Sequence, residues 1–344
     1  MDFKRPPKWK RRLRWLMQAA ALAAGAGLAA SYLVQRHRDA VAADMRPAGS
    51  FVTIEGRRTH FRLSGSGDFT FVLEAGLGDY SDRWGKLERD LVRLGRVFVY
   101  DRAGLGWSDS SPSPRTTGQM AEELQAVLTA ARVPKPYVLV GHSLGGTIAV
   151  RFASDHRADV AGVFLIDPGH PDQFKRLPAP PLIIAWVAPQ LMRAASFGLP
   201  QLLFKSSDPV QNQSTHVRTT GEEFRCALAD DATAWPRPLS LGRLPMVVLT
   251  AADTSRFPGG SPEKKQAAWR TWHALHEEIL AASSGDFRRH IVVEGATHSI
   301  HLSHAAIALQ SATELIAHLN LQPNQEGLPV ADGTNAVPSS FSLP

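Results

Sequence analysis

The chain of 344 residues is long enough for one large domain with appended segments. Its composition, 44% hydrophobic and 20% charged, is typical of a folded protein with a sizeable core. The single cysteine, Cys226, excludes an intrachain disulfide framework and a zinc site built of several cysteines. Residues 1–14 carry seven basic residues and one acidic residue, which accounts for the whole net charge of +6. Nucleic-acid binding by the formally neutral remainder of the chain is therefore not expected.

The segment that follows the basic arm (residues 1–15) is apolar. Residues 16–34 read LMQAAALAAGAGLAASYLV and include no formal charge. As a helix they would extend about 28 Å, close to the ~30 Å hydrocarbon core of a bilayer. Seven basic residues precede the segment and only Arg36 and Arg38 follow closely, which predicts the N-terminus in the cytoplasm and the body outside. We expect a membrane signal-anchor; a cleaved signal peptide, which would leave the protein secreted, and a soluble helix are the alternatives.

Strand and helix patterns begin after a polar stretch, residues 35–50, that is typical of a linker. Alternating residues from Phe51 and again from Arg58 predict two strands of a hairpin around Gly56. Short apolar runs predict further strands at residues 69–73, 97–100, 137–140, 163–166, 246–249 and 291–293. Residues 117–131 and 147–154 have helical spacing. Strands that alternate with helices indicate a mostly parallel sheet covered on both faces.

Two further segments do not belong to this alternation. Residues 169–245 contain several prolines and long apolar stretches, and they predict a helical cap over the edge of the sheet. The core domain would then consist of residues 51–168 and 246–321. Residues 322–344 are rich in Pro, Gly, Ser and Asn, which predicts a disordered tail.

The sequence GHSLG at residues 141–145 lies between a predicted strand and a predicted helix. This is the context of a nucleophile elbow, where the serine occupies a strained turn and its neighbours two positions away must be small. Gly141 and Gly145 satisfy that requirement, and Ser143 would project above the sheet. The backbone N–H of Leu144 could then stabilise an oxyanion.

With this elbow, five blocks in order resemble a known family: LEAGLGD (73–79), YDRAGLGWSD (100–109), YVLVGHSLGG (137–146), VFLIDPGHPD (163–172) and EGATHSIHL (294–302). Residues 51–319 resemble the α/β-hydrolase superfamily, in its haloalkane-dehalogenase-like and prolyl-aminopeptidase-like branch. The resemblance implies an α/β-hydrolase fold, with a mostly parallel central sheet flanked by helices and an inserted helical cap.

The resemblance also implies the partners of Ser143. The family's catalytic histidine corresponds to His298, in the loop after the last strand, and the second oxyanion amide corresponds to Leu77. Two aspartates compete as the acid that orients the histidine: Asp253 follows the strand that most often carries it, whereas Asp167 ends the strand that carries it in a minority of relatives. Because residues 165–172 resemble a subgroup that often lacks an acid at the later position, Asp167 is favoured and Asp253 is the alternative.

These residues predict hydrolysis of an ester or related acyl bond through an acyl-enzyme, with no metal or cofactor required. A serine nucleophile argues against dehalogenase and epoxide-hydrolase chemistry, for which this branch uses an aspartate. Residues 180–204 include only one charge, Arg193, which suggests a hydrophobic acyl substrate. The alternatives are an aminopeptidase, with Glu222–Glu223 or Asp230–Asp231 holding the substrate ammonium, and a membrane-tethered binding protein without catalysis. The sequence does not determine the oligomeric state.

Overall fold

The computed structural model describes residues 8–178, 187–199, 206–229, 234–258 and 260–321, and its centre is one eight-stranded sheet. The order of the strands across the sheet is β1-β2-β4-β3-β5-β6-β7-β8. β1 pairs with β2, and β2 with β4, in antiparallel orientation, and all other neighbours are parallel. The strands are β1 (Ser50–Ile54), β2 (Arg57–Ser64), β3 (Thr70–Glu74), β4 (Arg96–Tyr100), β5 (Tyr137–His142), β6 (Val160–Ile166), β7 (Met246–Ala251) and β8 (Arg288–Val293). The predicted mostly parallel sheet is confirmed.

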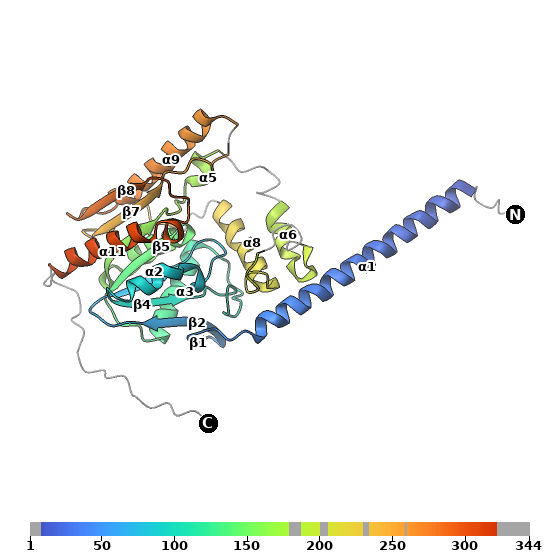
Figure 1. Cartoon of the computed structure of the whole chain (residues 1–344), viewed down its shortest axis with the longest axis horizontal. Coiled ribbons are helices and arrows are strands. Elements are labelled where there is room, and N and C mark those ends of the chain that lie inside the picture. The colour runs from blue at the N-terminus through green and yellow to red at the C-terminus, as the bar shows by residue number, and fades with distance from the viewer. Residues whose placement is uncertain (1–7, 179–186, 200–205, 230–233, 259, 322–344) are drawn as a thin grey trace, which may run out of the picture.

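Helices cover both faces of this sheet (Figure 1). On one face α3 (Thr117–Ala130) and α4 (Leu144–Asp155) pack over a core that includes Val72 of β3. On the other face α2 (Gly85–Leu91) and α11 (Ala305–Asn320) pack over Phe71 and Leu73 of the same strand. Successive side chains of a strand point to opposite faces, so a strand that is covered on both sides is apolar throughout. Helix α9 (Pro262–Ala281) lies along β7 and β8, and the short helices are η1 (Ser81–Trp84), η2 (Arg157–Asp159) and α10 (Ile300–Ser303).

The predicted cap contains four helices among the residues that the structure describes, with turns and irregular stretches between them. It comprises α5 (Gln173–Arg176), α6 (Ala188–Arg193), η4 (Ala195–Phe197) and α8 (Ser214–Leu228). Helices α6 and α8 approach closely at Gly221, where an added Cβ would lie 2.7 Å from the Cβ of Met192. The end of the predicted insert packs with the core domain instead, because Trp235, Leu241 and Leu244 are buried in the same core cluster as residues of α3 and α4. The cap in space therefore ends before this stretch.

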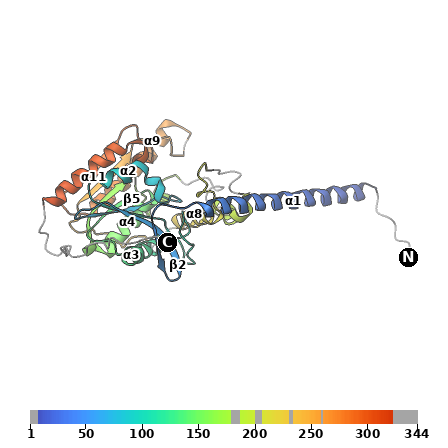
Figure 2. The ribbon, with the colours of Figure 1, turned by 60° about the horizontal axis from the view of Figure 1, so that its bottom comes forward.

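The N-terminal helix α1 (Lys8–Asp44) projects from the body (Figures 1 and 2). The prediction of a linker over residues 35–50 is wrong for most of its length, since the helix continues to Asp44. The physical reason is tertiary contact with the cap. Gln35 is completely buried and donates to the carbonyl of Asn212 at 2.8 Å, and Asp39 accepts hydrogen bonds from the backbone and hydroxyl of Ser214 at 2.8 and 2.7 Å. These contacts order a polar stretch that the sequence pattern alone left without a partner.

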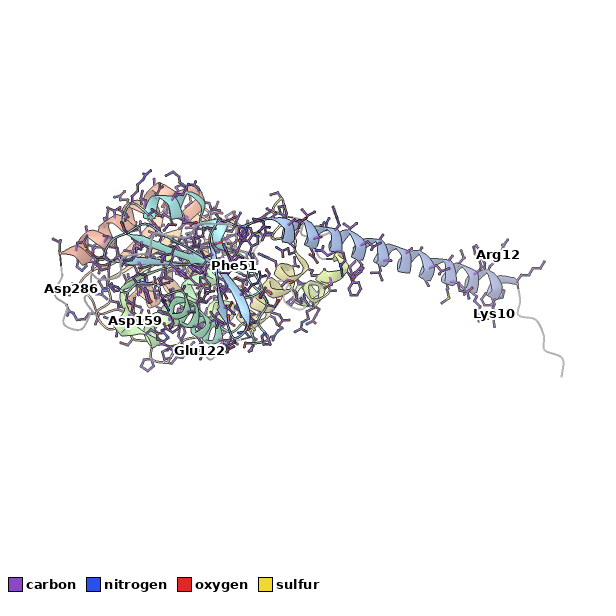
Figure 3. All side chains as sticks on the ribbon, turned by 90° about the horizontal axis from the view of Figure 1, so that it is seen from below. Lys10, Arg12, Phe51, Glu122, Asp159 and Asp286 are labelled. Atoms are coloured by element: carbon purple, nitrogen blue, oxygen red, sulfur yellow. The ribbon has the colours of Figure 1, made fainter. Side chains whose placement is uncertain are left out.

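The opposite end of α1 is exposed. Figure 3 shows Lys10 and Arg12 at the far end of the helix, away from Phe51 and the folded body, and all residues from 12 to 30 are exposed. Within the described part of the chain, α1 alone is long and apolar enough to cross a membrane. This criterion rests on length and composition, and a signal sequence also meets it. The predicted tail (322–344), the pair Asp230–Asp231 and most of residues 180–204 lie outside the described residues.

Candidate active site

Ser143 occupies the sharp turn between β5 and α4. Its backbone has φ +53° and ψ −123°, a strained conformation for a residue with a side chain. A Cβ added to Gly141 would lie 2.6 Å from the carbonyl oxygen of Gly145, and one added to Gly145 would lie 2.0 Å from that of Glu74. Gly146 is also required, since its Cβ would lie 2.5 Å from Pro168, and this glycine was not singled out in the sequence. The turn thus has the compact geometry that the GHSLG motif predicts.

Two side chains from other loops complete a line of contacts with this serine. The Nε2 atom of His298, in the loop after β8, lies 2.9 Å from Ser143 Oγ. The Nδ1 atom of the same ring lies 2.6 Å from the Oδ2 atom of Asp167, which directly follows β6. Asp253 lies elsewhere, because its carboxylate accepts hydrogen bonds from the backbone and hydroxyl of Ser255 at 2.7 and 2.8 Å. Of the two predicted acids, only Asp167 contacts the histidine.

The carboxylate of Asp167 is completely buried and fully hydrogen-bonded. Its Oδ1 atom accepts hydrogen bonds from the backbone N–H of Ala251 at 3.1 Å and from the indole N–H of Trp272 at 2.9 Å. Burial alone would raise the pKa of Asp167, but the hydrogen bond from His298 and the positive charge of Arg256 outweigh it and hold this pKa well below its ordinary value. The group is therefore ionised at neutral pH and able to fix the tautomer of His298.

Arg256 is a member of this site that sequence reasoning missed. Its guanidinium donates to the Oδ2 atom of Asp167 and also lies against His298 Nδ1, so the guanidinium and the imidazole share one carboxylate oxygen. It is held over the faces of Trp272 and Phe257, with its Cζ atom 4.5 and 4.9 Å from the two ring centroids. No motif marks this arginine, because its partners come from three separate loops and from α9.

Two histidines close to Ser143, His298 and Asp167 are neutral at neutral pH. His142 packs between the rings of His298 and His301 at centroid distances of 4.8 and 4.4 Å, and burial lowers its pKa well below the ordinary value. His276 in α9 is completely buried, which lowers its pKa to about 3, and it contacts the ring of Trp272. Neither ring can therefore act as a charged group at neutral pH.

The predicted oxyanion residues, Leu77 and Leu144, line the same cavity as Ser143. Leu144 is the first residue of α4, where backbone N–H groups and the helix dipole favour negative charge. Leu77 lies in the loop after β3, beside Gly76 and Gly78, and Gly78 has φ +63°. Both residues thus lie at the cavity that contains Ser143, and their role as oxyanion donors stays a prediction.

A buried arginine fixes the loop of Leu77. Arg102 donates to the carbonyl oxygens of Ala75 and Gly76, at 2.6 Å each, and to the carboxylate of Glu74 at 2.8 Å. Its Nε atom donates to Glu223 of the cap helix α8 at 2.8 Å, and Glu223 also accepts the backbone N–H of Gly78 at 3.0 Å. Burial favours protonation of Glu223, but the charge of Arg102 prevails and lowers its pKa. Sequence reasoning did not identify this cluster.

The same cluster bears on the predicted ammonium-binding pair. The carboxylate of Glu223 is occupied by Arg102 and Gly78, and that of Glu222 is paired with Arg193 and Arg225 at 2.7 and 2.8 Å. Glu222–Glu223 therefore offers no free pair of carboxylates to a substrate ammonium.

The cavity at Ser143 has a volume of about 280 Å³. Its walls come from the elbow, from α5, from α8 and from the loop of Arg256. Apolar side chains dominate among the described residues that line it, and they are Leu77, Leu144, Phe174, Leu177, Pro178, Phe224, Ala227, Phe257, Pro258 and Trp272. Among the described residues that line the cavity, Arg256 is the only arginine or lysine. Such a mainly apolar pocket with few polar groups is typical of a small-molecule site.

Comparison with known proteins agrees with this fold. A model of the Alpha/beta hydrolase family matches residues 63–309. The uncharacterized protein YqjL of Bacillus subtilis (strain 168) is 31% identical over 251 residues, which are 72% of this chain and 84% of that protein. The solved structure of the epoxide hydrolase CorEH has a TM-score of 0.58 at 18% identity, covering 78% of this chain and 98% of its own. A thermophilic esterase from Thermogutta terrifontis has a TM-score of 0.55 at 19% identity, covering 79% and 99%. The match over most of the folded body, together with the sheet and its helices, shows that this chain belongs to the alpha/beta hydrolase family.

Proposed function

We propose that this protein is a serine hydrolase that cleaves an ester or a related acyl bond. Ser143 attacks the carbonyl carbon while His298 removes its proton through Nε2. Asp167 holds the opposite ring nitrogen as N–H and stabilises the imidazolium that forms. The backbone amides of Leu77 and Leu144 stabilise the oxyanion. The oxyanion then collapses, the bond to the leaving group breaks, and His298 gives its proton to that group, which leaves the acyl-enzyme. A water molecule that His298 deprotonates hydrolyses the acyl-enzyme and frees Ser143.

The observation that carries this proposal is the unbroken contact from nucleophile to acid. Ser143 Oγ and His298 Nε2 are 2.9 Å apart, and His298 Nδ1 and Asp167 Oδ2 are 2.6 Å apart. These distances lie within hydrogen-bond reach without any rearrangement, as acyl transfer by a serine requires. The epoxide hydrolase among the structural neighbours is 18% identical and shares the fold. A shared fold at this identity does not indicate that this chain hydrolyses epoxides.

We infer a hydrophobic acyl group from the lining of the cavity. Phe174, Phe224 and Trp272 supply much of its wall, and its volume of about 280 Å³ suits a small or medium acyl chain. Arg256, ion-paired with Asp167, adds a cationic edge next to the reacting serine. The substrate would thus place its acyl chain against the aromatic rings and its carbonyl at the amides of Leu77 and Leu144.

The place of action follows from the N-terminal helix. We infer that α1 is a signal-anchor, with the basic end in the cytoplasm and the hydrolase domain outside it. The 37 residues of α1 would extend about 55 Å, so the helix can cross a bilayer and still reach the cap with its last turns. The contacts of Gln35 and Asp39 with the cap support this arrangement, since they join the helix to the domain that it would anchor.

The decisive experiment is covalent labelling of the full-length chain with a fluorophosphonate probe, followed by turnover of an aryl ester. We expect Ser143 to be labelled, and both labelling and turnover to be absent in Ser143→Ala. Turnover of the ester but not of an aminoacyl anilide would distinguish this enzyme from an aminopeptidase. Labelling at another residue, or ester turnover retained by Ser143→Ala, would overturn the mechanism.

A further inference from the structure

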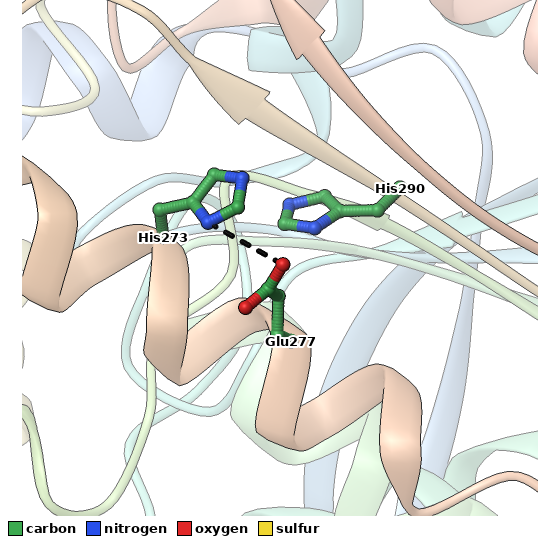
Figure 4. Close-up of side chains that lie close together, drawn as sticks. All are labelled: His273, Glu277 and His290. Carbon is green, nitrogen blue, oxygen red and sulfur yellow. Dashed lines mark ion pairs between the residues drawn. The ribbon is translucent and has the colours of Figure 1, made fainter.

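A second cluster of ionisable side chains lies between α9 and β8, away from the cavity at Ser143 (Figure 4). His273 and Glu277 are one helical turn apart on the same face of α9, and His290 extends toward them from β8. Each residue offers one ligand atom, and these atoms lie within 4.8 Å of one another. The Nδ1 atom of His273 is 3.7 Å from Glu277 Oε1, and the two imidazole rings are 4.4 Å apart between centroids.

A chain of hydrogen bonds fixes which nitrogen of His290 carries the proton. The Nε2 atom of His276 lies 2.9 Å from the carbonyl oxygen of Pro168, which can only accept, so this nitrogen is an N–H. The Nδ1 atom of the neutral ring then accepts from the hydroxyl of Thr250 at 2.6 Å. The hydroxyl has used its proton, so it accepts from His290 Nε2–H at 2.7 Å. The Nδ1 atom of His290 is thereby left with a free lone pair.

That lone pair is directed into the cluster. Figure 4 shows a nitrogen of each imidazole ring facing the carboxylate of Glu277. Metal-binding histidines in proteins commonly donate their second N–H to a neighbouring acceptor, which fixes the tautomer and the orientation of the ring. Thr250 and His276, which are both completely buried, provide this support for the partly buried His290. The arrangement is that of a metal ligand with its supporting hydrogen bonds in place.

We propose that His273, Glu277 and His290 bind a divalent transition-metal ion of the zinc class. Two imidazole nitrogens and one carboxylate oxygen are a usual set for Zn²⁺, with water as the fourth ligand. A tetrahedral ion with bonds of about 2 Å holds its ligand atoms about 3.3 Å apart. The ligand atoms therefore have to approach one another by up to about 1.5 Å, to which rotation of the exposed side chain of Glu277 can contribute. Mg²⁺ and Ca²⁺ prefer oxygen ligands and would not bind here.

The test is calorimetric titration of the full-length chain, in detergent and without a histidine tag, with Zn²⁺ alone. We expect one ion per chain, a rise in the thermal unfolding midpoint with Zn²⁺, and no response to Mg²⁺. His273→Ala and Glu277→Gln change the surface of a helix and should fold, but each should weaken Zn²⁺ binding by at least tenfold. His318→Ala is the matched control, because this histidine stacks on Phe287 outside the cluster and its loss should leave binding unchanged.

The support by Thr250 gives a separate test. Thr250→Ser keeps the hydroxyl and should retain the affinity for Zn²⁺, whereas Thr250→Val should reduce it by about 10–100-fold. Zn²⁺ affinity that is the same in the wild type, His273→Ala and Glu277→Gln would overturn the proposal, as would Mg²⁺ binding with equal strength. Because binding is measured without substrate, the result is independent of the proposed hydrolase activity.

Discussion

Replacing Asp167 by asparagine tests the assignment of the triad acid most sharply. The Oδ1 atom accepts two hydrogen bonds from groups that cannot move away, the backbone N–H of Ala251 and the indole N–H of Trp272. An asparagine that keeps its carbonyl oxygen there points its NH₂ group at His298 and at Arg256, so Arg256 loses its acceptor as well. The ring then becomes an acceptor at Nδ1 and carries its proton on Nε2, so it can no longer accept the proton of Ser143.

We expect Asp167→Asn to reduce ester turnover by about 10⁴-fold, as a reversed tautomer does in other triads. At about 1.36 kcal/mol per tenfold, this corresponds to about 5.4 kcal/mol of transition-state stabilisation. The assay is kcat and kcat/KM of an aryl ester, with near-ultraviolet circular dichroism to check the fold.

Asp253→Asn is the matched control for this prediction. Among the described residues its carboxylate accepts hydrogen bonds from Ser255, in its own turn, and surface substitutions of this kind change energies by about 0.5 kcal/mol or less, which is within about threefold. A loss smaller than tenfold in Asp167→Asn would refute the tautomer argument. A large loss in Asp253→Asn instead would transfer the role to that residue.

The remaining predictions concern stability, substrate and topology. Glu223→Gln weakens the buried partner of Arg102 and should reduce the free energy of unfolding, measured by urea denaturation, by about 3–5 kcal/mol. Glu222→Gln changes a partly exposed pair and should reduce it by less than about 1 kcal/mol. Equal effects of the two variants would contradict the role of the buried pair. Catalytic efficiency should rise with acyl length from acetyl to at least hexanoyl esters, by up to about 0.8 kcal/mol for each buried methylene; a steady fall from acetyl onward would rule out the apolar pocket. A reporter fused to the C-terminus should be active only outside the cytoplasm, and N-terminal sequencing of the mature protein should find the basic arm retained. A full-length protein that stays soluble in the cytosol would exclude both the anchor and the signal peptide.

The sequence predicted the parts of the structure that depend on neighbouring residues. The strands and the elbow at Ser143 follow from local apolar runs and from glycines at fixed spacing. The choice between Asp167 and Asp253 could not be made locally, because both follow strands that end at the same edge of the sheet. Only the distance to His298 distinguishes them.

The missed residues interact over long sequence separations. Arg102 and Glu223 are 121 positions apart, and Arg256 and Asp167 are 89 apart, so neither pair produces a pattern within any window of the sequence. The polar composition of residues 35–44 predicts a linker, because it gives no sign of the cap that Gln35 and Asp39 contact. In each case the tertiary partner, rather than the local pattern, decides the structure.

The hydrogen bonds of Glu223 also constrain how a substrate can enter. The carboxylate of Glu223 joins helix α8 of the cap to Arg102 and to the backbone N–H of Gly78. Ser214, at the start of the same helix, joins α8 to Asp39 of α1. Lifting α8 would separate the buried charges of Glu223 and Arg102, at a free-energy cost of several kcal/mol. We therefore expect α8 to stay in place while a substrate enters and a product leaves.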